Sequence, residues 1–195
     1  MAAMRGSIMD LEGIKIKACS GVYEPREDSY LLAQMVEKYA FGSVLDLGTG
    51  SGIQGIVAAK KGCNVVFSDI DEKALECAKE NAVLNGVTGT FVESDMFSSI
   101  KGAFNTIIFN PPYLPEDGSS KGSEDIALDG GYDGRKYIDI FLKEYKNHIA
   151  NEYAALWLES SLNSYENDVA GNAKIVASSR LFFEELVVVM ASNRF

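Results

Sequence analysis

The feature that most constrains this chain of 195 residues is one segment, residues 104–113, with the sequence FNTIIFNPPY. Its apolar first half is typical of a short buried β-strand. Two consecutive prolines then end the strand, because neither has an N–H group to give to a sheet. The strand therefore delivers Asn110, Pro111, Pro112 and Tyr113 to its carboxyl end, and ligands bind at that edge of open α/β sheets.

These four residues suit the methylation of a planar nitrogen. The amide oxygen of Asn110 and the carbonyl of Pro111 can both accept hydrogen bonds from an NH2 group, whose delocalised lone pair makes it a poor nucleophile. Holding that group while charge develops on nitrogen is preorganised electrostatic stabilisation. We therefore predict that Asn110, Pro111 and Tyr113 are catalytic, with Tyr113 stacking on the target, and that Pro112 joins them in binding substrate. The alternative is a strand followed by an ordinary Pro-Pro turn.

A second buried strand, residues 43–47, leads into the sequence DLGTGSG. Glycines at alternate positions, beginning with Gly48 and Gly50, let a backbone approach a ligand closely. The run also fits the dinucleotide fingerprint through Gly55. However, Asp46 lies inside the strand end, where a carboxylate attracts an ammonium or sulfonium group and repels a pyrophosphate. We interpret the turn as a binding site for S-adenosylmethionine, and NAD binding is the alternative.

Acidic residues also end the next two strands. Asp69 follows the glycine turn by about 20 residues and is placed to bind a ribose diol. Asp71 is expected to be the N-cap of the following helix. Asp95 comes after the strand Thr90–Glu93 and can accept a hydrogen bond from an adenine amino group, while Met96 or Phe97 covers the ring. The alternative for Asp95 is a capping residue before a short turn.

The segments around these strands have weaker signals. Residues 1–22 alternate faintly and are predicted to form an N-terminal extension or an edge hairpin. A helix follows Pro25, and Glu27, Asp28 and Ser29 are interpreted as residues that cap its start. Residues 114–134 hold many glycines and acids between two predicted elements, so we interpret them as a substrate loop over Asn110.

Composition limits the function classes. Hydrophobic residues make up 47% of the chain and charged residues 24%, which is typical of globular proteins and fits one domain over residues 1–195. The formal net charge of −10 disfavours nucleic acid as a partner. Because no run reaches the ~18 apolar residues of a membrane span and the first residues lack a signal-peptide core, we expect a cytoplasmic protein without a membrane partner.

Cysteine and histidine usage excludes other chemistries. Cys19, Cys63 and Cys77 form no Cys-x-x-Cys pair, and an odd number gives no disulfide framework. We interpret all three as buried thiols in a reducing compartment. The only histidine is His148, so we predict no metal site and no histidine-based catalytic triad.

The order of the predicted elements indicates the fold. Strands alternate with helices along most of the chain. Its last third is predicted to hold a helix that runs to about Ile149, a strand over Tyr153–Glu159 and a short helix over residues 164–170. The last two strands then follow each other with almost no helix between them. This order predicts an α/β fold: a Rossmann-like, doubly wound, mostly parallel seven-stranded sheet whose last strand is antiparallel.

The combination of VLDLGTGSG, SDID, SD and NPPY resembles the class I S-adenosylmethionine-dependent methyltransferases that modify planar NH2 nitrogens. Two further stretches, VYEPREDSYLL at residues 22–32 and ALDGGYDGRKYIDIF at residues 127–141, resemble the HemK-type N5-glutamine methyltransferases. Bacterial members carry an additional N-terminal helical domain, which is not expected in the 45 residues before Asp46. The short form resembles the archaeal and eukaryotic release-factor glutamine methyltransferases.

The resemblance implies roles for the matched positions. Asn110 and Pro111 are expected to bind the target amide, which is the glutamine of the Gly-Gly-Gln tip of a class 1 release factor. Relatives of the short type work with a small zinc-binding activator subunit, for which the strand Thr90–Glu93 offers an open edge. The cofactor-binding residues are expected to be Ser29, Asp46, Gly48, Gly50, Asp69, Asp95, Met96 and Asn110.

Besides an NAD-dependent oxidoreductase, which the glycine turn also allows, two rival functions remain open from the sequence. An N6-adenine methyltransferase acting on DNA or RNA uses the same NPPY chemistry, although the net charge and the lack of a target-recognition domain stand against it. A non-enzymatic cofactor-binding scaffold would have a damaged site, whereas every expected position is filled here. The exact substrate, the need for an activator and the oligomeric state are not fixed by the sequence.

Overall fold

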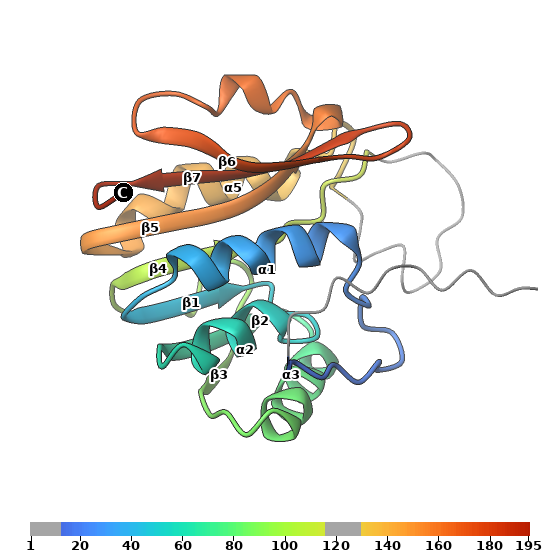
Figure 1. The fold of residues 1–195 in the computed structure, drawn as a ribbon, viewed down its shortest axis with the longest axis vertical. Helices are drawn as coiled ribbons and strands as arrows, with labels where there is room; N and C mark the ends of the chain where they lie inside the picture. The colour runs from blue at the N-terminus through green and yellow to red at the C-terminus, as the bar shows by residue number, and fades with distance from the viewer. Residues whose placement is uncertain (1–12, 116–129) are drawn as a thin grey trace, which may run out of the picture.

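The computed structural model describes residues 13–115 and 130–195, which form one seven-stranded sheet with helices on both faces (Figure 1). The strand order is β3-β2-β1-β4-β5-β7-β6. The strands are β1 (Ser43–Leu47), β2 (Asn64–Asp69), β3 (Thr90–Glu93), β4 (Phe104–Phe109), β5 (Ile149–Ser160), β6 (Ala173–Arg180) and β7 (Glu185–Ser192).

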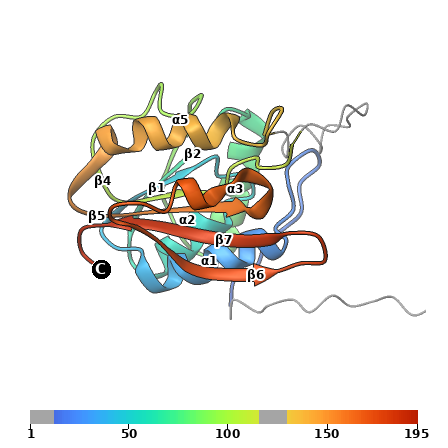
Figure 2. The same cartoon turned by 90° about the horizontal axis from the view of Figure 1, so that it is seen from above.

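Helices cover both faces because each strand of a parallel sheet is reached by a crossover connection. Figure 2 shows α5 on one face of the sheet and α1 on the other. One apolar cluster joins α1, α2 and α3 to the sheet, and a second packs α5 on the opposite face. The helices are α1 (Glu27–Tyr39), α2 (Ile53–Lys60), α3 (Glu72–Leu84) and α5 (Lys136–Glu144), with 3₁₀ turns η1 (Tyr145–His148), η2 (Ser161–Asn163) and η3 (Tyr165–Asn167).

The predicted fold class is confirmed. The strands from β3 to β5 pair in parallel, and β7 runs antiparallel between β5 and β6. The predicted N-cap is also confirmed, because the Asp71 carboxylate accepts a hydrogen bond from the Lys73 N–H at 2.9 Å.

Element boundaries differ from the prediction in the last third of the chain. The helix expected to reach Ile149 ends at Glu144, and β5 begins at Ile149 instead of Tyr153. A register shift between Phe104 and Thr106 lets this early part of β5 pair with β4. The short helix expected over residues 164–170 is replaced by η2 and η3. Ser164 lies between them in a left-handed conformation with φ 55°, which ends η2 and separates it from η3.

The prediction of an edge hairpin for the N-terminal extension is wrong for its described part, residues 13–22. This segment forms no strand and runs along α3, where two asparagine side chains bind its backbone. Asn85 accepts from the Lys15 N–H at 2.9 Å, and Asn81 accepts from the Lys17 N–H at 2.9 Å. Residues 1–12 lie outside the described part of the chain.

The interpretation of all three cysteines as free thiols is also wrong. Cys19 and Cys77 form a disulfide bond, and Cys63 is the free cysteine of the described chain. The asparagine contacts along α3 explain the pairing, because they lay the N-terminal segment on the helix beside Cys77. A separation of 58 residues and an odd cysteine count hid this pair in the sequence.

The two ends of the predicted substrate loop are joined. The N–H of Gly130 donates to the carbonyl of Leu114 at 2.9 Å, so the chain leaves and re-enters the fold at one place. Residues 116–129 of this loop lie outside the described residues. Within the described ranges, no helix is long and apolar enough to cross a membrane.

Candidate functional site

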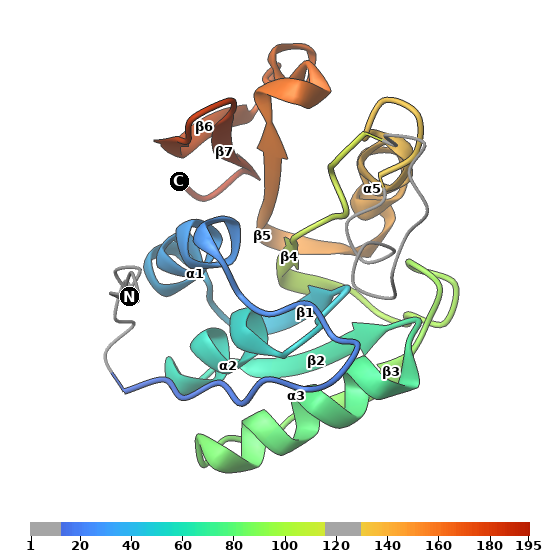
Figure 3. The same ribbon diagram turned by 90° about the vertical axis from the view of Figure 1, so that its right-hand side faces the viewer.

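A cavity of about 290 Å³ opens at the carboxyl ends of the parallel strands. Figure 3 views the molecule from this edge. The turns after β1, β2, β3 and β4 all contribute to the wall, together with the start of α1 and the N-terminal segment at Gly21, Val22 and Tyr23. Ligands of doubly wound sheets bind in this location, outside the carboxyl ends of the strands.

The glycine turn after β1 forms one side of the cavity. Gly48 and Gly50 line the cavity and have φ values of 61° and 53°. Residues with a Cβ rarely adopt this backbone conformation. The Asp69 carboxylate accepts from the Gly50 N–H at 2.9 Å and lines the cavity as well. The structure therefore brings together three of the predicted cofactor-binding residues.

Asp46 is placed differently from the prediction. It is fully buried, accepts hydrogen bonds from the Thr49 hydroxyl at 2.6 Å and the Gly55 N–H at 2.8 Å, and is not among the residues that line the cavity. Side chains alternate along a strand, so Asp46 points to the face covered by α2. Its carboxylate thus supports the glycine turn from below, and the prediction that it contacts the cofactor directly is not met by this geometry.

Burial raises the pKa of Asp46 to about 7, against the two hydrogen bonds that lower it. A buried acid with a raised pKa keeps its proton in the folded state at a pH where the unfolded chain has already lost it. The free energy of unfolding therefore falls as the pH rises from about 4 to about 7.

We expect Asp46→Asn to reduce this loss of stability, because the amide carries no charge at any pH. The measurement is the free energy of unfolding from urea titrations at pH 5 and at pH 8. The difference between the two pH values should be smaller for the variant than for the wild type. Parallel stability curves for the two proteins would contradict the raised pKa.

The turn after β3 supplies the next part of the wall. Asp95 is exposed, Met96 is half-buried, and both line the cavity as predicted for an adenine site. Met96 has φ 46°, a strained conformation for a residue with a side chain. Phe97, which we considered as a second cover for adenine, is instead buried and stacks on His148 and Phe141.

Asn110 lies on the cavity wall at the end of β4, held by the start of α1. Its amide nitrogen donates to the Asp28 carboxylate at 3.1 Å and to the Ser29 hydroxyl at 3.3 Å. Asp28 is 3% exposed and also accepts from the Tyr23 hydroxyl at 3.0 Å. The interpretation of Asp28 and Ser29 as helix caps is therefore wrong, since Arg26 occupies the N-cap position and the two side chains orient Asn110.

Two buried acceptors near this point have no partner among the described atoms. They are the side-chain oxygens of Asn110 and Gln54, and both residues line the cavity. Gln54 donates from its nitrogen to the Ser29 carbonyl at 2.9 Å, so its oxygen is fixed as well. An unpaired buried acceptor costs free energy, and a ligand that donates hydrogen bonds removes this cost.

The rest of the NPPY segment divides between cavity and core. Pro112 lines the cavity, whereas Pro111 is buried beside it. Tyr113 is 6% exposed, packs in the apolar cluster with α1 and is absent from the cavity lining. Because the ring is buried in this cluster and does not line the cavity, the expected stacking of Tyr113 on the target does not agree with this arrangement.

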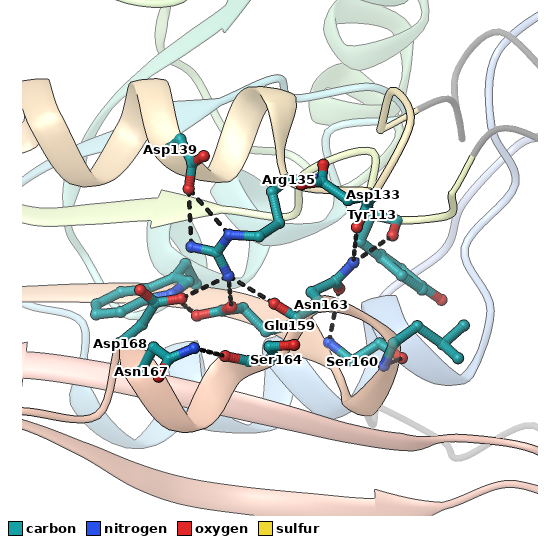
Figure 4. Close-up of polar contacts among 12 residues, drawn as sticks. Tyr113, Asp133, Arg135, Asp139, Glu159, Ser160, Asn163, Ser164, Asn167 and Asp168 are labelled. Carbon is teal, nitrogen blue, oxygen red and sulfur yellow. Dashed lines mark hydrogen bonds and ion pairs between the residues drawn. The ribbon is translucent and has the colours of Figure 1, made fainter.

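Figure 4 shows a buried asparagine that sequence reasoning missed. The Asn163 nitrogen donates to the Tyr113 carbonyl at 2.7 Å and to the Asp133 carbonyl at 3.4 Å, and its oxygen accepts from the Ser160 N–H at 3.1 Å. Gly134 packs so closely here, with φ 74°, that a Cβ would collide with the Tyr113 carbonyl. Asn163 therefore fixes the end of NPPY against the returning end of the substrate loop.

Arg135 anchors Asn163 from the other side. One guanidinium nitrogen donates to the Asn163 carbonyl at 2.6 Å and pairs with Asp168 at 2.9 Å and with the buried Glu159 at 3.6 Å. Burial raises the pKa of Glu159, and the neighbouring Asp168 raises it further. The Trp157 N–H donates to Glu159 at 2.6 Å, so this acid at the end of β5 is held on both sides.

We expect Asn163→Ala to lower the free energy of unfolding by about 1–3 kcal/mol, because the buried Tyr113 carbonyl loses its partner. The measurement is thermal and urea unfolding. Asn167→Ala is the matched control, since Asn167 is exposed and donates only one long bond of 3.3 Å to the Ser164 carbonyl. Equal, small losses for both variants would show that the buried contact is not needed.

The sequence of this chain is similar to those of known methyltransferases. Residues 14–124 match the family model described as "Methyltransferase small domain". The chain is 40% identical over 193 residues to a provisionally named protein N5-glutamine methyltransferase of Methanocaldococcus jannaschii, covering 94% of this chain and 98% of that protein. It is 33% identical to the "Release factor glutamine methyltransferase" of Deinococcus radiodurans, covering 63% of this chain and 48% of that protein.

Solved structures share the fold at low sequence identity. A crystal structure of ribosomal protein L11 methylase from Lactobacillus delbrueckii superposes with a TM-score of 0.66 at 19% identity, over 96% of this chain and 90% of that chain. A Thermus thermophilus 16S rRNA methyltransferase in complex with AdoMet and guanosine gives a TM-score of 0.65 at 20% identity, over 88% of this chain and 44% of that chain.

Proposed function

Since this chain belongs to the methyltransferase small domain family, we propose that it transfers a methyl group from S-adenosylmethionine to the side-chain amide nitrogen of a glutamine. The proposed substrate is the glutamine of the Gly-Gly-Gln tip of a class 1 translation release factor. Asn110 carries the proposal: its buried oxygen has no partner among the described atoms, and its nitrogen is held by Asp28 and Ser29.

The relatives support a protein substrate. The archaeal relative is matched over nearly its whole length, and its name gives glutamine N5 as the methylated atom. The Deinococcus relative is named for release factors. The formal net charge of −10 also favours a protein over a nucleic acid, whose phosphates require a basic surface.

The cavity residues fit S-adenosylmethionine. When bound, this molecule supplies an electrophilic methyl group on a sulfonium centre. The glycine turn at Gly48 and Gly50 would hold its methionine part, Asp69 its ribose, and Asp95 with Met96 its adenine. The unpaired oxygen of Gln54, which the sequence did not identify as a site residue, adds an acceptor on the same wall. Carbonyl and carboxylate acceptors suit a ligand that is cationic and rich in N–H and O–H donors.

Asn110 would orient the target. Because its nitrogen donates to Asp28 and Ser29, its oxygen is left to accept from the NH2 of the glutamine amide. The Pro111 carbonyl is the proposed second acceptor. Two fixed acceptors would hold the amide nitrogen in one orientation and stabilise the positive charge that develops on it, without reorganisation at the moment of reaction.

The predicted zinc-binding activator subunit stays a prediction. Its proposed site, β3, is the edge strand of the sheet, which supports pairing with a partner strand. Residues 90–93 pair with β2 on the other side, so an added strand would extend the sheet without disturbing the cavity.

The proposed function is tested by mass spectrometry of a release factor incubated with the enzyme and S-adenosylmethionine carrying an isotopically labelled methyl group. The expected result is one labelled methyl on the glutamine of Gly-Gly-Gln. Parallel reactions contain adenine-bearing DNA or RNA in place of the protein. Label on nucleic acid alone would replace the proposal with the N6-adenine reaction, and label on neither would reject both substrates.

A further inference from the structure

The β6–β7 hairpin ends in two phenylalanines that the fold does not use. Phe182 and Phe183 are 100% and 97% exposed. The turn between the strands is residues 181–184, and because the Leu181 N–H donates to the Glu184 carbonyl at 2.8 Å, the two aromatic residues form its tip. Turns between strands are normally built from glycine, proline, asparagine, aspartate and serine. Two exposed rings in their place add nothing to the core and expose apolar surface to water.

This hairpin loop belongs to the edge of the sheet that carries the cavity. Leu186 of β7 pairs with Ser160, the last residue of β5, and the Ser160 hydroxyl donates to the Glu184 carboxylate at 2.6 Å. The Ser160 N–H donates in turn to Asn163, which binds the Tyr113 carbonyl. Figure 1 shows the turn of the hairpin on the same side as the start of α1.

Two more exposed apolar side chains lie in segments that are hydrogen-bonded to the hairpin or to Asn163. Leu162 of η2 is 47% exposed, and its neighbour Ser161 accepts from the Glu185 N–H at 3.0 Å. Tyr132 is 93% exposed and precedes Asp133, whose carbonyl accepts from Asn163. We call these four residues the apolar rim: Tyr132, Leu162, Phe182 and Phe183.

We propose that the apolar rim binds the surface of the protein substrate around its target glutamine. This inference rests on the proposed function and adds a surface to it. The cavity of about 290 Å³ is the size of one small ligand, so the body of a folded substrate has to be held outside it. Exposed aromatic side chains beside a binding site are typical anchors of protein interfaces.

The charges at the rim favour a protein over a nucleic acid. Aromatic rings also stack on bases, but such surfaces combine them with basic residues. Here Glu184 and Glu185 follow the two phenylalanines directly, the nearby Arg180 pairs opposite Glu185, and the chain carries a formal net charge of −10. Phosphates would be repelled at this tip, whereas the apolar surface of a protein can cover both rings.

The test is a steady-state comparison of three proteins with an intact release factor and with a short peptide that contains Gly-Gly-Gln. Phe182→Ser with Phe183→Ser removes the rings of the hairpin. Val83→Ser with Leu84→Ser is the matched control, because these are also adjacent, exposed apolar residues, at 74% and 51%, and they lie at the opposite end of α3 from the cavity. Unfolding temperature and calorimetric affinity for S-adenosylmethionine are measured for all three.

The hairpin variant is expected to raise KM for the intact release factor by at least about tenfold, as for a lost interface anchor. Its kcat/KM for the short peptide, its unfolding temperature and its cofactor affinity are expected to match those of the wild type and the control.

An unchanged KM for the intact protein overturns the docking proposal while the proposed function stands. No transfer by the wild type overturns both. A wild-type dimer that the hairpin substitution alone makes monomeric identifies the rim as a self-association surface and also overturns docking.

Discussion

Replacing Asn110 by alanine is expected to lower kcat for methyl transfer by at least about a hundredfold, the magnitude seen when one preorganised polar contact of a transition state is removed. The variant loses the oxygen that we assign to the target amide. It also leaves the Asp28 carboxylate and the Ser29 hydroxyl without the amide that now joins them. Affinity for S-adenosylmethionine should change by less than about tenfold, because most of the cavity wall comes from other turns.

The measurements are single-turnover methyl transfer and calorimetric binding of S-adenosylmethionine. Asn105→Ala provides the matched control on the same strand. Asn105 lies at the other end of β4, where its side chain binds Ser43 and the Glu152 carbonyl, so its loss should lower stability and leave the rate constant unchanged. Near wild-type transfer by Asn110→Ala would remove Asn110 from the mechanism.

Replacing Asp69 by alanine is expected to weaken binding of S-adenosylmethionine by about 10- to 100-fold. The carboxylate accepts from the Gly50 N–H at 2.9 Å, and burial raises its pKa, so it is a partly desolvated acceptor on the cavity wall. Its removal takes away the proposed ribose partner and also releases the glycine turn. Isothermal titration calorimetry measures the change directly.

Asp71→Ala separates ligand binding from helix capping. Asp71 also lines the cavity, but its carboxylate caps α3 through the Lys73 N–H. Its loss should therefore lower the free energy of unfolding by about 1 kcal/mol and weaken cofactor binding much less than the loss of Asp69. If the two variants weaken cofactor binding equally, the assignment of the ribose to Asp69 is incorrect.

Local patterns were sufficient to predict the fold and several of the residues that meet at the cavity. Asp69 is the last residue of β2, and four other residues lie within about three positions after the end of a strand: Gly48, Gly50, Asp95 and Met96. Parallel strands bring their carboxyl ends to one edge. The position of such residues depends only on where a strand ends. Their meeting around one cavity therefore follows from the order of the strands.

Positions that depend on distant contacts were not predictable. Asp28 is typical of a helix start in the sequence, and only the fold brings it to Asn110, 82 residues later. Asn163 lies 50 residues from the Tyr113 carbonyl that it binds. Tyr113 is aromatic in a functional motif, yet its ring fills the core. In each case the packing of α1 or η2 against β4 and β5 decides the role.

Asp46 is a different case, because the alternation of side chains along β1 already predicts which face of the sheet it lies on. It lies between Leu45 and Leu47, which pack in the cluster around α5, so alternation turns Asp46 to the other face. There it meets Gly55, whose lack of a side chain leaves room for the carboxylate. Applying the period of two would have identified Asp46 as a support for the glycine turn.

The most direct test of the account is the distance between the Asn110 side-chain oxygen and the target nitrogen. It can be measured in a crystal structure of the protein with S-adenosylhomocysteine and a peptide containing Gly-Gly-Gln. The account predicts a hydrogen bond of about 2.7–3.2 Å to the glutamine amide, with the Asn110 nitrogen still bound to Asp28. A glutamine amide bound elsewhere, with the Asn110 oxygen turned away from it, would contradict the account.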